Sequence, residues 1–289
     1  MIIVASKPGQ LGNILFVYSH VIARAIESNL SVANPALDEY ADLFPSTRGD
    51  LLCRFPARQS RLGATAWRRK LVYRFFHGIG RILGKLKLDL PPVRQITLRD
   101  WHTEFDLGDP EFLAGLKPRQ GVLLLGWLFR DSRAMEKHSG TVREFFRPHE
   151  RNQQNIDELI TRARQDSDVL VGVHVRHGII HFANTRKYFY TAQRYGEMMD
   201  ELVELFPGKR VSFLICSDWP QDPKLFSRFK VTFGTGDLIE DMYGFARCDY
   251  LIGPPSTFTM WASFYGQVPL NIICRNDQPQ ALDDFRVQT

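Results

Sequence analysis

The segment VLVGVHVRHG (residues 169–178) decides the fold of this chain of 289 residues. Its first part, VLVGVHV, is a short apolar run that predicts a strand, and segments at about 151–165 and 191–205 predict helices on either side of it. Short apolar strands that alternate with helices indicate an α/β fold with a parallel sheet and crossover helices. Arg176 is then expected just beyond the carboxyl end of a parallel strand, where open α/β sheets bind ligands.

The same alternation extends from this segment toward both ends of the chain. Further strands are predicted at 1–6, 121–126, 211–217, 229–233, 250–253 and 269–273. Further helices are predicted at about 13–28, 67–86, 132–146, 237–247 and 256–265, whereas residues 34–60 are expected to be rich in loops. A boundary near Pro148 gives two Rossmann-like domains, 1–148 and 149–289, the first with a basic helical insert at about 54–87.

The composition fits an ordinary soluble globular protein, with 44% apolar and 24% charged residues. The cysteines have neither a CxxC pair nor zinc-ligand spacing, and we interpret them as buried thiols in a reducing compartment: Cys53, Cys216, Cys248 and Cys274. No apolar run of 18 or more residues and no signal peptide is found, so a cytoplasmic location is expected.

The net charge of +5 is unevenly distributed along the chain. Residues 51–88 contain ten Lys or Arg and no Asp or Glu, and subtracting those ten charges from +5 leaves −5 for the rest. The basic helix predicted from Trp67 to Leu86 has apolar residues at every fourth position. It can lie on anionic lipid, or it can pack on its domain with a solvated basic face. Nucleic acid is not expected as a partner, because no aromatic platform accompanies the charge.

Two motifs offer groups that could bind a phosphate. The guanidinium of Arg176 is a planar fork that holds two phosphate oxygens, although a surface Arg that closes a strand gives the same pattern. In GPPSTFTMWASFYG (253–266), Ser256 or Thr257 is expected to cap a helix whose first backbone amides can face an anion. Ordinary N-capping is the alternative explanation for this second motif.

Two further motifs follow predicted strands. In LICSDWP (214–220), the Asp218 carboxylate can accept hydrogen bonds from N1–H and the exocyclic amine of guanine; alternatively, Asp218 or Ser217 caps the short helix after Pro220. KPGQLGN (7–13) is a glycine turn that opens a helix and either brings backbone amides to a ligand or simply connects the two elements. It lacks the third glycine and the acidic residue of the dinucleotide-binding fingerprint.

Four segments, in this order, resemble motifs of the alpha-1,2-fucosyltransferase family and related GDP-fucose-dependent fucosyltransferases: GQLGN (9–13), GVHVRHG (172–178), LICSD (214–218) and ARCDYLIGPPSTFTMWASFYG (246–266). The resemblance covers the first 30 residues and about 168–270. It implies a GT-B glycosyltransferase fold, with two facing Rossmann-like domains and mostly parallel sheets. The C-terminal domain would bind the nucleotide sugar and the N-terminal domain the acceptor. The reaction would invert the anomeric carbon and need no metal and no other cofactor.

The resemblance also implies a role for individual residues. Arg176 would bind the diphosphate and stabilise the departing GDP, and Asp218 would recognise guanine. The remaining predicted contacts to the nucleotide sugar or its cleft are Gly12, Asn13, His174, Ser256, Thr257 and Phe258.

The chain departs from the family pattern next to Arg176. The second Arg of the family is His177 here, and the acidic residue after the glycine is Ile179. Histidine titrates near neutral pH, so His177 or His181 is a candidate general base. His174, His177 and His181 do not share one helical face and have no acidic or Cys ligand among them, so no metal site is predicted.

The sequence thus predicts fucosyl transfer from GDP-fucose to a bacterial surface glycan. The expected partners are a nucleotide-sugar donor, a glycan or lipid-linked glycan acceptor, and an anionic membrane surface. The protein would then be peripheral at the inner face of the cytoplasmic membrane. Two alternatives stay open: the same fold with another nucleotide-sugar donor, and a catalytically inactive protein that binds a glycan or nucleotide.

Overall fold

The computed structural model describes residues 1–86, 93–100, 102–116, 120–178 and 188–288. They form two compact units, Met1–His149 and Glu150–Gln288. Each unit contains one five-stranded sheet, and every strand pair in these sheets is parallel except the pair β2–β3. The predicted α/β class with mostly parallel sheets is therefore confirmed.

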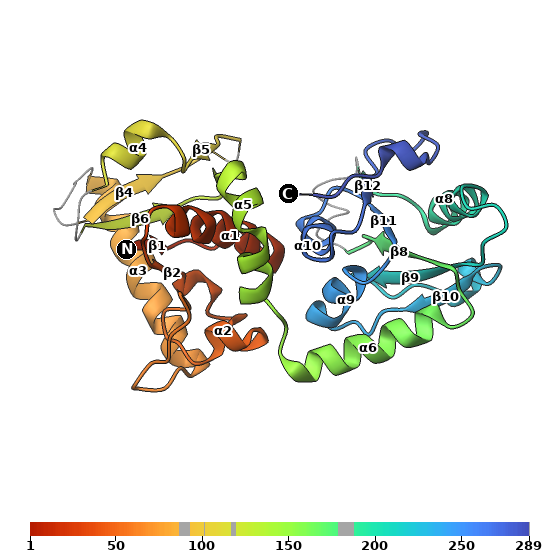
Figure 1. Cartoon of the computed structure of the whole chain (residues 1–289), viewed down its shortest axis with the longest axis horizontal. Coiled ribbons are helices and arrows are strands. Elements are labelled where there is room, and N and C mark those ends of the chain that lie inside the picture. The colour runs from red at the N-terminus through yellow and green to blue at the C-terminus, as the bar shows by residue number, and fades with distance from the viewer. Residues whose placement is uncertain (87–92, 101, 117–119, 179–187, 289) are drawn as a thin grey trace. The chain divides into compact units, whose positions relative to one another are not determined.

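The first unit has the strand order β3-β2-β1-β6-β4 (Figure 1). Its sheet consists of β1 (Ile2–Val4), β2 (Val32–Ala33), β3 (Arg54–Phe55), β4 (Val93–Thr97) and β6 (Gly121–Leu125). A separate parallel pair is formed by β5 (Phe105–Asp106) and β7 (Phe129–Arg130). The helices are α1 (Leu11–Glu27), α2 (Pro45–Arg48), α3 (Ala66–Leu86), α4 (Pro110–Ala114) and α5 (Ser132–Phe145), with 3-10 turns at Pro35–Leu37 and Ala41–Leu43.

Helix α3 packs closely on this sheet at a glycine. A Cβ atom at Gly80 would lie 2.8 Å from Leu125 Cδ2, so the missing side chain lets the helix approach β6. Phe76, one turn earlier, packs against the small apolar cluster that includes Ile3 and Leu123. The side of α3 that faces the sheet is thus fixed by Phe76 and Gly80.

The second unit has the strand order β10-β9-β8-β11-β12 (Figure 1). Its strands are β8 (Val169–Val175), β9 (Val211–Ser217), β10 (Lys230–Phe233), β11 (Tyr250–Gly253) and β12 (Leu270–Ile272). Its helices are α6 (Glu150–Arg164), α8 (Ala192–Glu204), α9 (Leu238–Phe245) and α10 (Thr257–Gly266), with 3-10 turns at Pro223–Phe226 and Leu282–Asp284.

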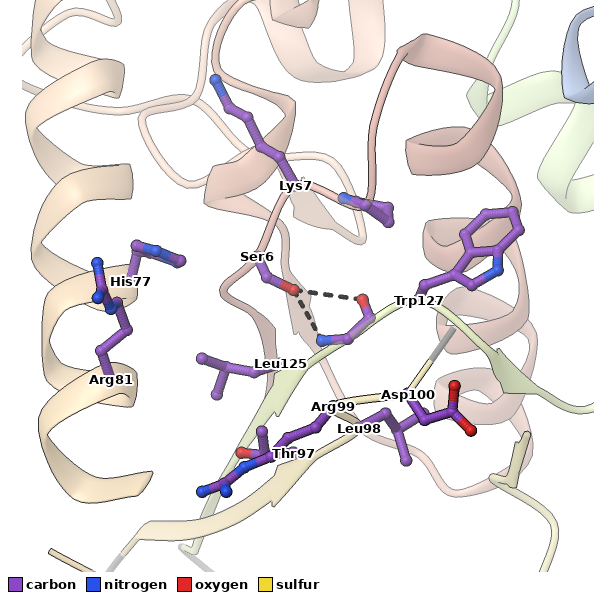
Figure 2. A pocket seen from close by; sticks show the side chains of 12 residues that line it. Ser6, Lys7, His77, Arg81, Thr97, Leu98, Arg99, Asp100, Leu125 and Trp127 are labelled. Carbon is purple, nitrogen blue, oxygen red and sulfur yellow. Dashed lines mark hydrogen bonds between the residues drawn. The ribbon is translucent and has the colours of Figure 1, made fainter. Parts of the chain in front are cut away.

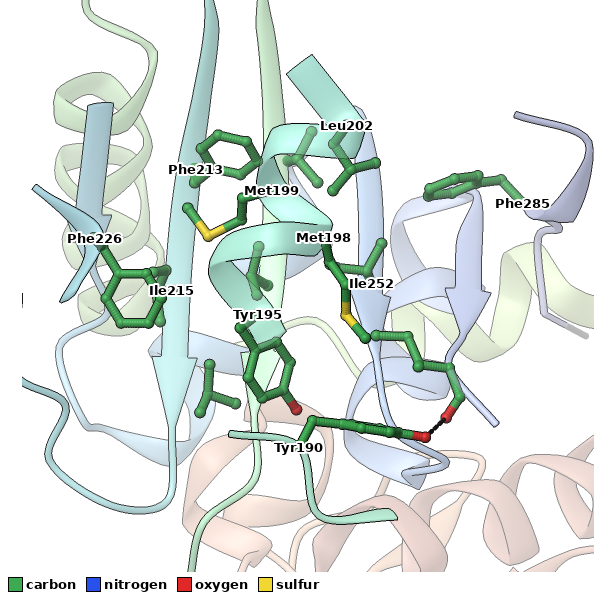
Figure 3. Packing of buried hydrophobic residues seen from close by; sticks show 14 residues of the cluster. Tyr190, Tyr195, Met198, Met199, Leu202, Phe213, Ile215, Phe226, Ile252 and Phe285 are labelled. Carbon is green, nitrogen blue, oxygen red and sulfur yellow. Dashed lines mark hydrogen bonds between the residues drawn. The ribbon is translucent and has the colours of Figure 1, made fainter. Parts of the chain in front are cut away.

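Strand β8 is buried on both faces. Val171, Val173 and Val175 pack with α8 in one apolar cluster, in which Met198 and Met199 take part (Figure 3). On the other face, a Cβ at Gly172 would lie 2.7 Å from a ring carbon of Phe245 on α9. Burial on both faces explains why this segment reads as a continuous apolar run.

Both sheets have a topological switch point. In the second unit the chain runs outward through β8, β9 and β10 and then returns to the other side of β8 with β11. The first unit repeats the pattern, with β6 on the side of β1 opposite to β2. In open α/β sheets, ligands bind beyond the carboxyl ends of the strands that flank such a point. Ligand binding is therefore expected at the ends of β8 and β11 and at the ends of β1 and β6.

Several local predictions need correction. Strand β4 and the two-residue strands β2 and β3 were not predicted, because two residues carry no periodicity and β4 (VRQIT) mixes polar with apolar positions. Cys274 is exposed, whereas the other three cysteines are buried as expected. Cys274 follows β12 and already lies in the loop that leaves the sheet, so its apolar neighbours in sequence do not bury it.

Candidate functional site

The predicted residues of the second unit gather at one edge of its sheet. His174 and Arg176 belong to the end of β8 or follow it, Asp218 follows β9, and Ser256 follows β11. Strands β9, β8 and β11 are neighbours and run parallel, with Val175 paired to Ser217 and Val173 paired to Ile252. These four residues therefore lie at the carboxyl edge, beside the switch point.

Arg176 connects two of these strand ends. Its Nη1 donates a hydrogen bond of 3.0 Å to the carbonyl oxygen of Pro255, in the loop that precedes α10. Burial lowers the pKa of Arg176, and the negative charge of Asp218 raises it, but a guanidinium keeps its charge at any working pH. A permanent positive charge is thus fixed between the end of β8 and the start of α10.

Asp218 organises the turn that follows Arg176. Its Oδ1 accepts hydrogen bonds from the backbone amides of His177 (2.8 Å) and Gly178 (2.9 Å). The alternative in which Asp218 or Ser217 caps the short helix after Pro220 is wrong, because Asp222 caps it by accepting from the amide of Lys224.

His177 is held through both ring nitrogens. Its Nε2 lies 2.6 Å from the carbonyl oxygen of Tyr190, which can only accept, so Nε2 carries the proton. Nδ1 then accepts from Nε2 of Gln221 at 3.2 Å, and the ring stacks on Phe189 with centroids 4.9 Å apart. A general base needs an available lone pair, so this geometry favours an anchoring role; catalysis by His177 stays a prediction. His181 and Ile179 lie outside the described residues.

The start of α10 packs on His174. Ser256 is the N-cap residue, as predicted, and its side chain accepts from the amide of Phe258 at 3.3 Å. The Phe258 ring lies 5.2 Å from the buried His174 ring, measured between centroids, and Thr257 is the first helical residue. A Cβ at Gly253 would lie 2.8 Å from His174 Cβ, so the glycine permits this close packing. The first turn of α10 is therefore positioned beside Arg176.

A cavity of about 360 Å³ opens beyond β9 and β10 in the same unit. Asp218 lines it, and so does Asp241 of α9, a functional candidate that the sequence did not single out. Asp241 is almost fully buried and accepts from the amides of Thr235 (2.7 Å) and Gly236 (3.2 Å), while burial raises its pKa to about 6. The only signal in the sequence was the acidic pair Glu240–Asp241 inside an otherwise apolar helix.

Gly12 and Asn13 belong to the other unit. They lie in the first turn of α1, just after the carboxyl end of β1, where Asn13 Nδ2 donates to the carbonyl of Pro8 at 2.9 Å. Gly9 has φ of +129°, and a Cβ there would lie 2.7 Å from Asn13 Nδ2, so this turn requires glycine. The GQLGN motif is thus a glycine-dependent turn that holds Asn13 in place.

Comparisons with known proteins address the fold. No family model matches the chain, and no curated protein matches its sequence. A solved structure of an Arabidopsis thaliana FUT1 mutant in complex with GDP matches with a TM-score of 0.63 at 12% identity, covering 99% of this chain and 73% of that one.

Two other solved structures match over nearly their full length. NodZ alpha-1,6-fucosyltransferase soaked with GDP-fucose has a TM-score of 0.54 at 16% identity, with 97% of each chain covered. POFUT1 in complex with GDP has a TM-score of 0.54 at 12% identity, covering 93% of this chain and 96% of that one. The chain therefore has the GT-B fold of the fucosyltransferases, as the resemblance of its four motifs predicted.

Proposed function

We propose that this protein is a glycosyltransferase that transfers fucose from GDP-fucose to a glycan. The observation that carries the proposal is the gathering of Arg176, Asp218 and Ser256 at the carboxyl edge of β9, β8 and β11. Solved structures with the same fold bear GDP or GDP-fucose, which supports this choice of donor.

The proposed site stabilises a leaving diphosphate. Arg176 and the first backbone amides of α10 offer positive charge and hydrogen-bond donors beside the switch point. As an acceptor hydroxyl oxygen attacks the anomeric carbon from the opposite face, the bond from that carbon to the diphosphate oxygen breaks and GDP leaves with the electron pair. The hydroxyl proton passes to a base or to solvent, and the anomeric centre inverts. Interactions that strengthen as the diphosphate gains charge accelerate the step, and here the protein supplies the cation without a metal ion.

Guanine recognition is assigned to the cavity beyond β9 and β10. A carboxylate there can accept from N1–H and the exocyclic amine together, a pair of donors that uracil and adenine do not offer. Asp218 is the residue that the sequence predicts, and Asp241 is a second carboxylate on the same cavity. Asp218→Asn and Asp241→Asn separate the two: the variant of the guanine-binding residue should lose stabilisation by GDP, while the other keeps it.

The direct test of the function is release of GDP from GDP-fucose in the absence of acceptor, together with melting temperatures in GDP, UDP, ADP and CMP. A ligand that binds the folded protein raises the melting temperature by mass action. We expect slow GDP release and stabilisation by GDP alone. If the protein hydrolyses a different nucleotide sugar instead, that sugar nucleotide is the donor. If GDP stabilises the protein but no GDP is released from GDP-fucose, the protein is an inactive binding protein.

Helix α3 supports a membrane-associated role. The apolar stripe predicted on this helix does not pack as a whole on the domain: Leu83 is buried, but Trp67 (60%), Leu71 (53%) and Phe75 (61%) are largely exposed. The exposed Lys70 and Arg74 are next to these side chains in a segment without acidic residues, whereas Arg69 is buried and pairs with Asp42. Exposed aromatic and aliphatic side chains among basic ones are typical of helices that lie in an anionic lipid interface.

We therefore also propose that α3 docks on anionic lipid, at the inner face of the cytoplasmic membrane, and that the acceptor is a lipid-linked or surface glycan. Among the helices that the structure describes, none is long and apolar enough to cross a bilayer. Attachment through α3 needs no such helix.

A further inference from the structure

The first unit has a cavity at its own topological switch point. The cavity has a volume of about 340 Å³ and is lined by residues that follow β1, β6 and β4 and by His77 and Arg81 of α3 (Figure 2). Ser6 Oγ joins the two strand ends that flank the switch point, since it accepts from the amide of Gly126 (2.8 Å) and donates to the carbonyl of the same residue (3.2 Å). The cavity therefore lies where a sheet of this topology binds ligands.

The lining has an excess of positive charge. Arg81 and Arg99 are exposed, and neither makes a hydrogen bond or ion pair within the part of the chain that the structure describes. The other charged groups of the lining are already engaged. Lys7 pairs with Asp38 (2.7 Å) and Glu39 (2.9 Å), and Asp100 accepts from His102 and Thr103. The donors to Asp100 are a neutral amide and a hydroxyl, so its carboxylate keeps its charge as the one acidic group among the lining residues that the structure describes. Arg81 and Arg99 are the two cations of the lining without a protein partner among the described residues, and together they outweigh Asp100 and can attract an anion.

The other walls suit a sugar. His77 Nδ1 lies 3.0 Å from the carbonyl oxygen of Ala5, so Nδ1 carries the proton and Nε2 is the acceptor of the neutral ring. The ring stacks on Tyr73 with centroids 5.4 Å apart, which fixes its orientation. Trp127 lines the opposite side of the cavity, as Figure 2 shows. An imidazole acceptor for a hydroxyl and an aromatic wall fit a polyhydroxylated ring that also has apolar faces.

We propose that this cavity binds an anionic sugar of the acceptor, a saccharide that carries a carboxylate or a phosphate. The inference rests on the proposed transfer to a glycan, and it adds the chemical class of that glycan. Arg81 and Arg99 pair with the anionic group, because a guanidinium matches the two oxygens of a carboxylate or phosphate. His77 Nε2 accepts from a neighbouring hydroxyl.

The experiment measures binding of three disaccharides to the full chain by titration calorimetry: cellobiose, cellobiouronic acid, which bears a carboxylate, and cellobiose 6-phosphate. We expect at least one of the two anionic sugars to bind at least tenfold more tightly than cellobiose, and the stronger of the two identifies the anionic group. In the double variant R81Q/R99Q, the affinity for that anionic sugar should fall at least tenfold. R133Q, which removes an exposed charge from α5 in the same unit, is the matched control and should bind like the parent protein.

Two results would overturn the proposal: equal or absent binding of all three sugars at millimolar concentration, or a loss in R81Q/R99Q no larger than in R133Q. Stabilisation by GDP and release of GDP from the donor are measured in parallel, and both should be unchanged in R81Q/R99Q. If the parent protein lacks both donor activities but prefers the anionic sugar, the proposed function fails while the cavity assignment survives.

Discussion

Arg176 provides the sharpest test of the proposed chemistry. Its Nη1 bonds to the Pro255 carbonyl at 3.0 Å, which directs the guanidinium toward the first turn of α10. A hydrogen bond to a charged group contributes about 1.5–3 kcal/mol, and more of it is realised as the leaving diphosphate gains charge. At about 1.4 kcal/mol per factor of ten, Arg176→Ala should slow donor hydrolysis by about tenfold to a hundredfold.

The lysine variant separates charge from geometry. Arg176→Lys keeps the positive charge, but a single ammonium group cannot keep the Pro255 contact and also grip two phosphate oxygens through a planar fork. We therefore expect Arg176→Lys to be impaired nearly as much as Arg176→Ala, with the loss in kcat rather than in KM.

The assay is GDP release under single-turnover conditions, after melting temperatures have shown that each variant folds. Arg228→Ala is the matched control, because this Arg lies in the same unit and forms a solvent-exposed ion pair with Asp200, a kind of contact that contributes little to stability. It should react like the parent protein. A folded Arg176→Ala protein with near-parental GDP release would refute the assignment of the diphosphate to this residue.

Three further predictions concern other parts of the molecule. His177→Ala should lower the melting temperature, since it removes the contacts to Tyr190 and Gln221, while the pH profile of donor hydrolysis keeps its shape. A changed profile in this variant would instead identify His177 as the base. Burial raises the pKa of Asp241 from 3.8 to about 6, so the folded state holds its proton more tightly and the free energy of unfolding should fall by about 2 kcal/mol as pH rises from 4 to 6. Urea unfolding of Asp241→Asn should lack this slope, and an unchanged slope contradicts the assignment. Replacing both Trp67 and Phe75 by Ser should reduce the amount of protein that sediments with vesicles of 30% phosphatidylglycerol at least fivefold. Leu225→Ser changes an exposed apolar residue of the other unit and should leave sedimentation unchanged. If the parent protein does not bind the vesicles at low salt, lipid docking through α3 is ruled out.

The sequence determined the elements that depend on local pattern. The apolar run of 169–175 predicted β8 with its observed bounds, because a strand that is buried on both faces, here at six of its seven residues, is apolar at nearly every position. Ser256 was predicted as a helix cap because capping depends only on the residue and on its next few amides, and the structure places it there. The motifs also pointed to the fold, since strand ends and glycine turns are encoded over a few residues each.

The contacts that give the site its chemistry join residues far apart in the chain, and only the tertiary structure decided them. Asp218 holds the amides of His177 and Gly178 across some 40 positions, and Arg176 reaches Pro255 across 79. Asp241 became a candidate only when α9 placed it on the cavity beyond β9 and β10. Helix α3 is another example. The sequence predicts one apolar stripe that contains both Trp67 and Leu83, but only Leu83 is buried in the structure. Which part of the stripe is buried depends on where Gly80 lets the helix approach β6. Local pattern fixes a strand or a helix, whereas the partner of each face is set by packing between distant segments.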